Sequence, residues 1–151
     1  LAQFQALIVG PVVSALGPGE GAVNLLTGTA LVESGLAYPA QIRGPALGLF
    51  QMEPVTHDDC WQTWLRYQSA TAASLLQVCG LSSPPDAGAM VSNLRYACAM
   101  ARVKYLRAAP SLPDASDAAG LSAYHKQHYH TLLGAANATR NTALFQQAID
   151  A

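Results

Sequence analysis

A helical pattern of apolar residues along nearly the whole chain constrains the fold more than any other feature. The sequence contains 28 alanines and no long stretch in which β-branched residues alternate with polar ones. Alanine favours helices, whereas a half-buried strand shows that alternation. The 151 residues have the length of one typical domain. The sequence therefore predicts a single, mainly α domain over residues 1–151, with one short β-hairpin as an option in the irregular stretch 35–55.

Glycine and proline divide this pattern into an expected six to eight helices. The clearest segments are residues 3–15, bent at Gly10-Pro11, then 22–34, a helix that starts at Pro54, 69–78, 86–107, 116–129 and 139–149. In the longest segment, the spacing predicts an inner face of Met90, Leu94, Ala97, Ala101 and Tyr105. The outer face is predicted to hold Ser92, Arg95 and Arg102.

Charge and hydropathy exclude two classes of partner. The net charge is −1, so the chain has no basic excess with which to bind nucleic acid, and no polybasic patch for anionic lipid. The apolar stretch 6–16 is interrupted by Gly10-Pro11 and is shorter than the ~20 residues that a membrane span needs. It also lacks the basic flank of a signal peptide. The first residue, Leu1, is compatible with a processed product, a fragment or a domain of a longer protein.

The three cysteines, Cys60, Cys79 and Cys98, lack the spacing of a metal site and are odd in number. Free cysteine is usually a small buried hydrophobic residue, so we expect three buried thiols. Thiols of this kind are typical of a protein that folds in a reducing cytoplasm.

Glutamate occurs at three positions, Glu20, Glu33 and Glu53. Glu33 is unusual because it extends the apolar stripe of helix 22–34 at the end of that helix. Burial there would favour the neutral carboxylic acid, which is the form that can protonate a leaving oxygen. The alternative is a carboxylate that bends away into solvent.

Three short motifs occur in order along the chain. Glu33-Ser34 is followed by Gly48-Leu49-Phe50-Gln51-Met52 and, on a later helix, by Ser122-Ala123-Tyr124-His125. Their order and spacing resemble the soluble lytic transglycosylase domain of the goose-type lysozyme superfamily, over residues 22 to about 131. Phage virion and lysis proteins of that family look most similar. The sequence departs from the family pattern at Phe50, where methionine is usual, and at His125, where asparagine is usual.

The resemblance implies a lysozyme-like fold with a cleft between the Glu33 helix and the Tyr124 helix. It implies a lytic transglycosylase that cleaves the β-1,4 bond between N-acetylmuramic acid and N-acetylglucosamine in peptidoglycan, with Glu33 as the catalytic residue and no cofactor. The protein would be phage-encoded, located in the virion or in the host cytoplasm at synthesis, and would act in the periplasm or cell wall. Its partners would be glycan strands and other virion proteins. The substrate-binding residues implied are Ser34, Gly48, Phe50, Gln51, Tyr124 and His125.

Three of these residues can also be interpreted without the resemblance. Gly48 allows close approach of the backbone to a ligand. Gln51 offers an amide to sugar groups, or else caps its own loop. Tyr124 suits a sugar subsite or a wet edge of the core equally well.

Other polar and aromatic residues lead to further hypotheses. His125, His128 and His130 cluster, but no carboxylate or cysteine at ligand spacing supports a metal site, so we expect none. Glu53, Asp58 and Asp59 are possible second carboxylates, although the two aspartates, with Thr56, fit the first turn of the Pro54 helix better. Tyr38, Trp61 and Trp64 could stack on sugars, although both tryptophans are expected in the core.

Two alternative functions remain open. The first is a hydrolytic muramidase that uses Glu33 with a second carboxylate. The second is a catalytically inactive virion structural or cell-wall-binding module, which the histidine at position 125 keeps open. If His125 faces Glu33, a protonated imidazole would favour ionised Glu33, so activity is predicted to fall as pH drops through the titration of His125. The alternative for His125 is a surface histidine.

Overall fold

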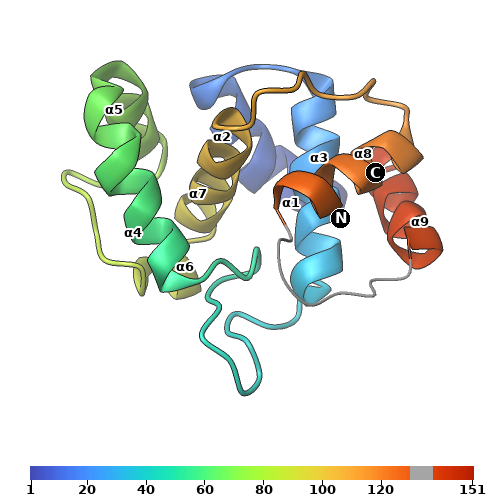
Figure 1. Ribbon diagram of the computed structural model, residues 1–151, viewed down its shortest axis with the longest axis horizontal. Helices are drawn as coiled ribbons and strands as arrows, with labels where there is room; N and C mark the ends of the chain where they lie inside the picture. Colours follow the sequence, from blue (N-terminus) through green and yellow to red (C-terminus); the bar gives the residue numbers. More distant parts are fainter. Residues whose placement is uncertain (130–137) are drawn as a thin grey trace.

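Helix α7 (Leu94–Leu106) lies at the centre of the structure, and the other helices pack around it. Figure 1 shows the computed structural model, which describes residues 1–129 and 138–151. Helices α4 (Pro54–Thr63) and α5 (Ser69–Val78) lie on one side of α7. Helices α3 (Glu20–Ser34), α8 (Ala118–His128) and α9 (Ala138–Ile149) lie on the other side. The prediction of a mainly α fold is confirmed.

The N-terminal segment is one helical stretch with a wider turn in the middle. It consists of α1 (Ala2–Phe4), the π-helix η1 (Gln5–Val9) and α2 (Gly10–Leu16). Pro11 has no N–H to give to the carbonyl of Leu7, four residues earlier. That carbonyl instead accepts from Arg95 Nε at 3.1 Å and Nη2 at 3.0 Å. The predicted disturbance at Gly10-Pro11 is therefore a π-helical turn whose free carbonyl is satisfied by α7.

The predicted helix 86–107 is two helices, so that prediction was wrong. Helix α6 (Ala89–Ser92) ends at Asn93, and α7 begins immediately after it. The Asn93 side chain accepts from the Tyr96 N–H at 3.0 Å and donates to the Cys79 carbonyl at 3.0 Å. These bonds make Asn93 an N-cap, a role in which asparagine competes with a continuous helix.

The predicted faces of this region also need two corrections. Leu94, expected inside, is 38% exposed because it lies at the break. Arg102, expected outside, is buried and donates from Nη2 to the Gly17 carbonyl at 3.1 Å. Helix α7 is buried on almost all sides, which is typical of a central helix rather than a surface helix.

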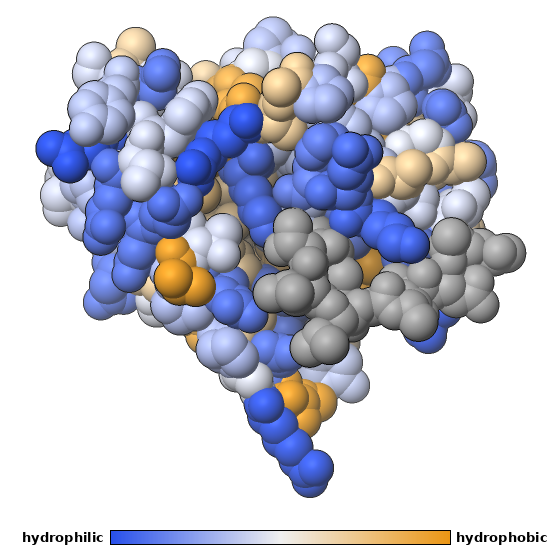
Figure 2. Space-filling model, in the orientation of Figure 1, coloured by the Kyte–Doolittle hydropathy of each residue, from blue (hydrophilic) through white to orange (hydrophobic). Residues whose placement is uncertain are grey.

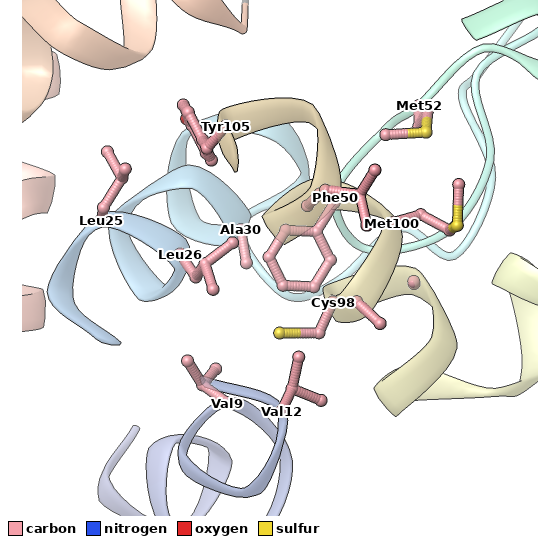
Figure 3. Packing of buried hydrophobic residues seen from close by; sticks show 14 of the residues in the cluster. Val9, Val12, Leu25, Leu26, Ala30, Phe50, Met52, Cys98, Met100 and Tyr105 are labelled. Carbon is pink, nitrogen blue, oxygen red and sulfur yellow. The ribbon is translucent and has the colours of Figure 1, made fainter. Parts of the chain in front are cut away.

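Between α3 and α4, the chain forms an irregular loop, residues 35–53, that projects from the body of the protein (Figures 1 and 2). Gly35 ends α3 in the left-handed conformation (φ 59°), as its position predicted. The optional hairpin is reduced to two isolated antiparallel bridges, Ala40 with Leu47 and Leu47 with Met52. At the base of the loop, Phe50 turns into the core, and Figure 3 shows its ring between α3, α7 and the N-terminal helix.

Between α4 and α5 the helical pattern is broken without a glycine or a proline. The 3₁₀ turn η2 (Leu65–Tyr67) separates α4 from α5. All three cysteines are buried and free, as predicted. None of the helices in the described parts of the chain has both the length and the apolar character needed to cross a bilayer.

Candidate active site

Glu33 lies in the last turn of α3, beside α8. Its Oε1 atom is 2.8 Å from Nε2 of His125. The His125 side chain is only 1% exposed and that of Glu33 is 11% exposed. The prediction that the end of α3 meets α8 at these two residues is confirmed, and the alternative of a surface histidine was wrong. The catalytic role of Glu33 stays a prediction.

The Glu33–His125 hydrogen bond can hold one proton in two ways. The carboxylic acid can donate to Nε2, or a ring N–H at Nε2 can donate to the carboxylate. The arrangement therefore provides an acid or a base on a side chain that still reaches the surface.

Aromatic rings surround the imidazole of His125. Tyr129 lies nearly parallel to it, with ring centroids 5.7 Å apart and planes at 21°. Phe145 of α9 packs on it with a centroid distance of 5.7 Å. Tyr105 packs against Tyr129 at 5.2 Å. These rings exclude water from one side of the pair and leave the imidazole little freedom to rotate.

The two tyrosine hydroxyls near the pair are engaged within the protein. Tyr129 donates to the Phe50 carbonyl at 2.8 Å. Tyr105 shares a 2.8 Å hydrogen bond with Thr29 of α3. Burial raises the pKa of both tyrosines well above the ordinary value, and the charge of Glu33 raises it further. Both hydroxyls are therefore neutral and act as structural donors.

Lys104, near the end of α7, was not singled out by the sequence. Its Nζ donates to the Tyr129 carbonyl at 2.6 Å and lies 4.4 Å from the centroid of the Tyr129 ring. Burial lowers the pKa of Lys104, while the charges of Cys60, Glu33 and Glu53 act in the opposite direction. A cation thus lies within electrostatic range of Glu33. Tyr129 was not singled out either. Its position four residues after His125, on the same face of a helix, is the sequence signal that could have identified it as a neighbour of His125.

Ser34 holds the loop that follows α3. Its buried hydroxyl lies 2.7 Å from the Leu49 carbonyl and 3.1 Å from the Ala30 carbonyl, and it accepts from the Leu36 N–H at 3.2 Å. These contacts connect the end of α3 to the Gly48–Met52 motif. They give Ser34 a structural role in place of the predicted contact with substrate.

Gly48 and Phe50 also serve the packing of the loop. Gly48 has φ 72°, and a Cβ atom there would lie 2.5 Å from the Met90 carbonyl oxygen. The close approach predicted for Gly48 is therefore real, but the neighbour is α6 and not a ligand. The Phe50 side chain is 1% exposed and belongs to the core. The resemblance implies a substrate contact through the main chain of Phe50, which stays a prediction.

Gln51 and Tyr124 match the alternatives that were left open for them. The Gln51 amide donates to the Gly48 carbonyl at 2.9 Å and to the Tyr38 carbonyl at 3.2 Å, so it caps its own loop. The Tyr124 side chain is buried, and its hydroxyl donates to the Pro110 carbonyl at 2.8 Å. Tyr124 therefore belongs to the edge of the core, and its hydroxyl is not directed at a sugar.

Of the three clustered histidines, the two that the structure describes have different neighbours. The His128 ring packs on Tyr124, with centroids 4.4 Å apart, while His125 contacts Glu33. His130 lies outside the described residues. Across the described ranges, no group of three histidine, cysteine, aspartate or glutamate side chains is arranged to hold a metal ion.

Asp58 and Asp59 do not cap α4, because this helix begins at Pro54 with Glu53 as its N-cap. Asp59 instead pairs with Arg107 at 2.9 Å, and this hydrogen bond lowers the pKa of Asp59. Asp58 lies 2.8 Å from Nδ1 of His57. Both carboxylates thus have partners of their own, away from the pair at Glu33.

A buried polar network joins α4 to α7, and sequence reasoning missed it. His57 Nε2 lies 2.7 Å from the Tyr96 hydroxyl, which also accepts from Trp61 Nε1 at 2.9 Å. Trp61 and Trp64 pack against the core, as predicted. Tyr38 remains exposed in the loop. The signal for the network was the apolar position of His57, which a satisfied buried histidine can occupy.

Comparison with other proteins adds no assignment. No family model matches this chain, and no curated protein or solved structure matches it either. The observations that bear on chemistry are therefore the Glu33–His125 pair and the groups around it.

Proposed function

We propose that this protein is a peptidoglycan lytic transglycosylase in which Glu33 is both the acid and the base. The observation that carries the proposal is the 2.8 Å contact between Glu33 and the buried His125. A partly buried carboxyl with a titratable partner can keep or release one proton at the end of a helix, which is what glycosidic cleavage requires.

The proposed reaction needs no net proton. Glu33 gives its proton to the glycosidic oxygen as the bond from that oxygen to C1 of N-acetylmuramic acid breaks. The acetamido group of the substrate stabilises the electron-poor C1. The Glu33 carboxylate then takes the proton of the C6 hydroxyl, and O6 bonds to C1 to give the 1,6-anhydro ring. The enzyme returns to its starting state after one turnover.

The surroundings of the other acidic residues favour a mechanism with one catalytic carboxylate over a mechanism with two. Asp58 and Asp59 interact with His57 and Arg107, and both side chains are more than half exposed. A hydrolytic muramidase would need a second carboxylate placed to activate water. Glu53 is the best candidate for such a second carboxylate, because it lies within electrostatic range of Lys104, as Glu33 does.

The test is digestion of purified peptidoglycan, with the products examined by mass spectrometry. We expect muropeptides with 1,6-anhydromuramic ends, each lighter by one water than its hydrolysed counterpart. Glu33→Gln should lower the rate at least ~100-fold while the circular dichroism spectrum is unchanged. Glu20→Gln, which alters an exposed glutamate at the other end of the same helix, should retain activity.

Each other outcome has a definite meaning. Reducing ends alone would replace the proposal with a hydrolytic muramidase, and Glu53→Gln would be the next variant to assay. Binding to cell wall without cleavage by the wild-type protein would indicate the inactive binding module. Near-normal cleavage by folded Glu33→Gln would remove the catalytic role from Glu33.

A further inference from the structure

Lys104 makes two contacts with one residue, Tyr129, which is the C-cap of α8. Its ammonium group donates to the Tyr129 carbonyl at 2.6 Å and lies 4.4 Å from the centroid of the same residue's ring. Lysine is strongly hydrated, and partial burial of its charge is unfavourable. The sequence has one other lysine, Lys126, which is exposed on α8. Lys104 is therefore the lysine whose half-buried ammonium group is held at the end of α8.

Tyr129 connects Lys104 to the Glu33–His125 pair. Its hydroxyl is bonded to the Phe50 carbonyl, so the ring is held at its far end as well. The Tyr129 ring is stacked on the His125 imidazole, and the planes of the two rings differ by 21°. The imidazole in turn contacts Glu33 at 2.8 Å. A continuous series of contacts thus runs from Lys104 through Tyr129 and His125 to Glu33.

We propose that Lys104 is a positioning residue for this site. Through Tyr129 it fixes the orientation of His125 toward Glu33. The inference deepens the proposed function, on which its kinetic test rests, whereas its electrostatic test does not depend on any activity.

The charged and titratable groups around Lys104 come from three other segments. Glu33 belongs to α3, Cys60 to α4, and Glu53 is the N-cap of α4. Tyr129 follows α8, and Tyr105 is the neighbour of Lys104 on α7. Because coupling between two sites is reciprocal, a carboxylate that stabilises the ammonium group is itself stabilised as an anion. Removal of the Lys104 charge should therefore favour the acid form of Glu33 over the carboxylate.

The electrostatic test follows the Glu33 carboxyl by NMR, which is practical because the sequence has three glutamates. Labelling with glutamate enriched in ¹³C at the carboxyl carbon gives signals from Glu20, Glu33 and Glu53, and the signal missing in Glu33→Gln identifies Glu33. We expect the acid form of Glu33 to persist to higher pH in Lys104→Met than in the wild-type protein, so that the midpoint of its signal moves upward. Lys126→Met removes the same charge from an exposed position and should leave the midpoint unchanged.

The kinetic test separates charge from position. In Lys104→Met, the alkaline limb of the pH–rate profile should move to higher pH and kcat should fall. Lys104→Arg should keep the wild-type position of the limb and the wild-type kcat. Lys104→Gln keeps a donor but no charge, so it should show the shifted limb with a smaller loss of kcat. Circular dichroism establishes that each variant is folded.

Two results would overturn the proposal. The first is a Glu33 titration that does not respond to Lys104→Met or Lys104→Gln. The second is an equal response to Lys126→Met, which would mean that any nearby charge acts in the same way. If the wild-type protein cleaves no peptidoglycan, the proposed function fails, whereas the NMR titration still decides the role of Lys104.

Discussion

Replacement of His125 by asparagine tests the chemistry of the central pair most directly. Asparagine can still hydrogen-bond to Glu33 but cannot take up a proton near neutral pH. A protonated imidazole, by contrast, places a positive charge beside Glu33. In the proposed reaction, the carboxylate that Glu33 becomes would then face an imidazolium whose Nε2 is 2.8 Å away.

The size of this effect follows from the geometry. Two unit charges whose centres lie about 4 Å apart attract by about 4 kcal/mol at an effective dielectric constant of ~20. This attraction makes the carboxylate a weaker base for the C6 hydroxyl. If a third of this attraction is lost in the transition state, the ring-closing step slows about tenfold. The wild-type rate should therefore fall on the acid side of its optimum.

The assay is the initial rate of turbidity loss of purified cell wall between about pH 5 and 8, the range in which imidazole titrates. We expect His125→Asn to retain at least about a tenth of the optimal activity and to lose the acid limb. His128→Asn is the matched control, because His128 is on the same helix but packs on Tyr124, and it should keep the acid limb. A folded His125→Asn protein with an unchanged acid limb would refute the pair as its source.

Three further predictions concern stability and can be measured by urea denaturation. Gly48→Ala should lower the free energy of unfolding by at least about 2 kcal/mol, because the new Cβ adds a left-handed backbone penalty to its clash with the Met90 carbonyl; an unchanged midpoint would contradict this. Gly28→Ala places a Cβ against the Phe145 ring, so we expect a net loss of about 1 kcal/mol after the gain in helix propensity, and a second change of Phe145 to leucine should recover it. Tyr96→Phe removes the hydroxyl that joins a buried histidine to a tryptophan and should cost about 2 kcal/mol; a loss under half of that would mean that the network contributes little.

The elements that sequence predicted well are those whose signals are local. Gly35 ended α3 and Pro54 began α4, because each residue restricts its own backbone dihedrals. The contact between Glu33 and His125 was also predicted, although it joins residues far apart in sequence. That prediction came from the resemblance to a family, because periodicity alone does not say which helices meet.

The predictions that failed depend on partners that are distant in the chain. Asn93 breaks a helix because the Cys79 carbonyl and the Tyr96 amide both bond to its side chain. Arg102 has an outward position on a helical wheel, but α7 has neighbours on nearly every side. The Tyr124 hydroxyl is used by the Pro110 carbonyl. In each case the tertiary contact decides the role, and no local pattern specifies it.

The position of Phe145 against His125 has a consequence for the order in which the protein becomes functional. The ribosome makes Glu33 early, whereas the helix that covers its partner comes about 110 residues later. At usual rates of bacterial and eukaryotic translation, this interval lasts roughly 5–20 s. His125 itself is made only about 20 residues before Phe145, so the imidazole lacks the ring that shields it for the last ~1–4 s of this interval. Synthesis itself thus delays maturation until the C-terminal helix has left the exit tunnel and docked on α3 and α8.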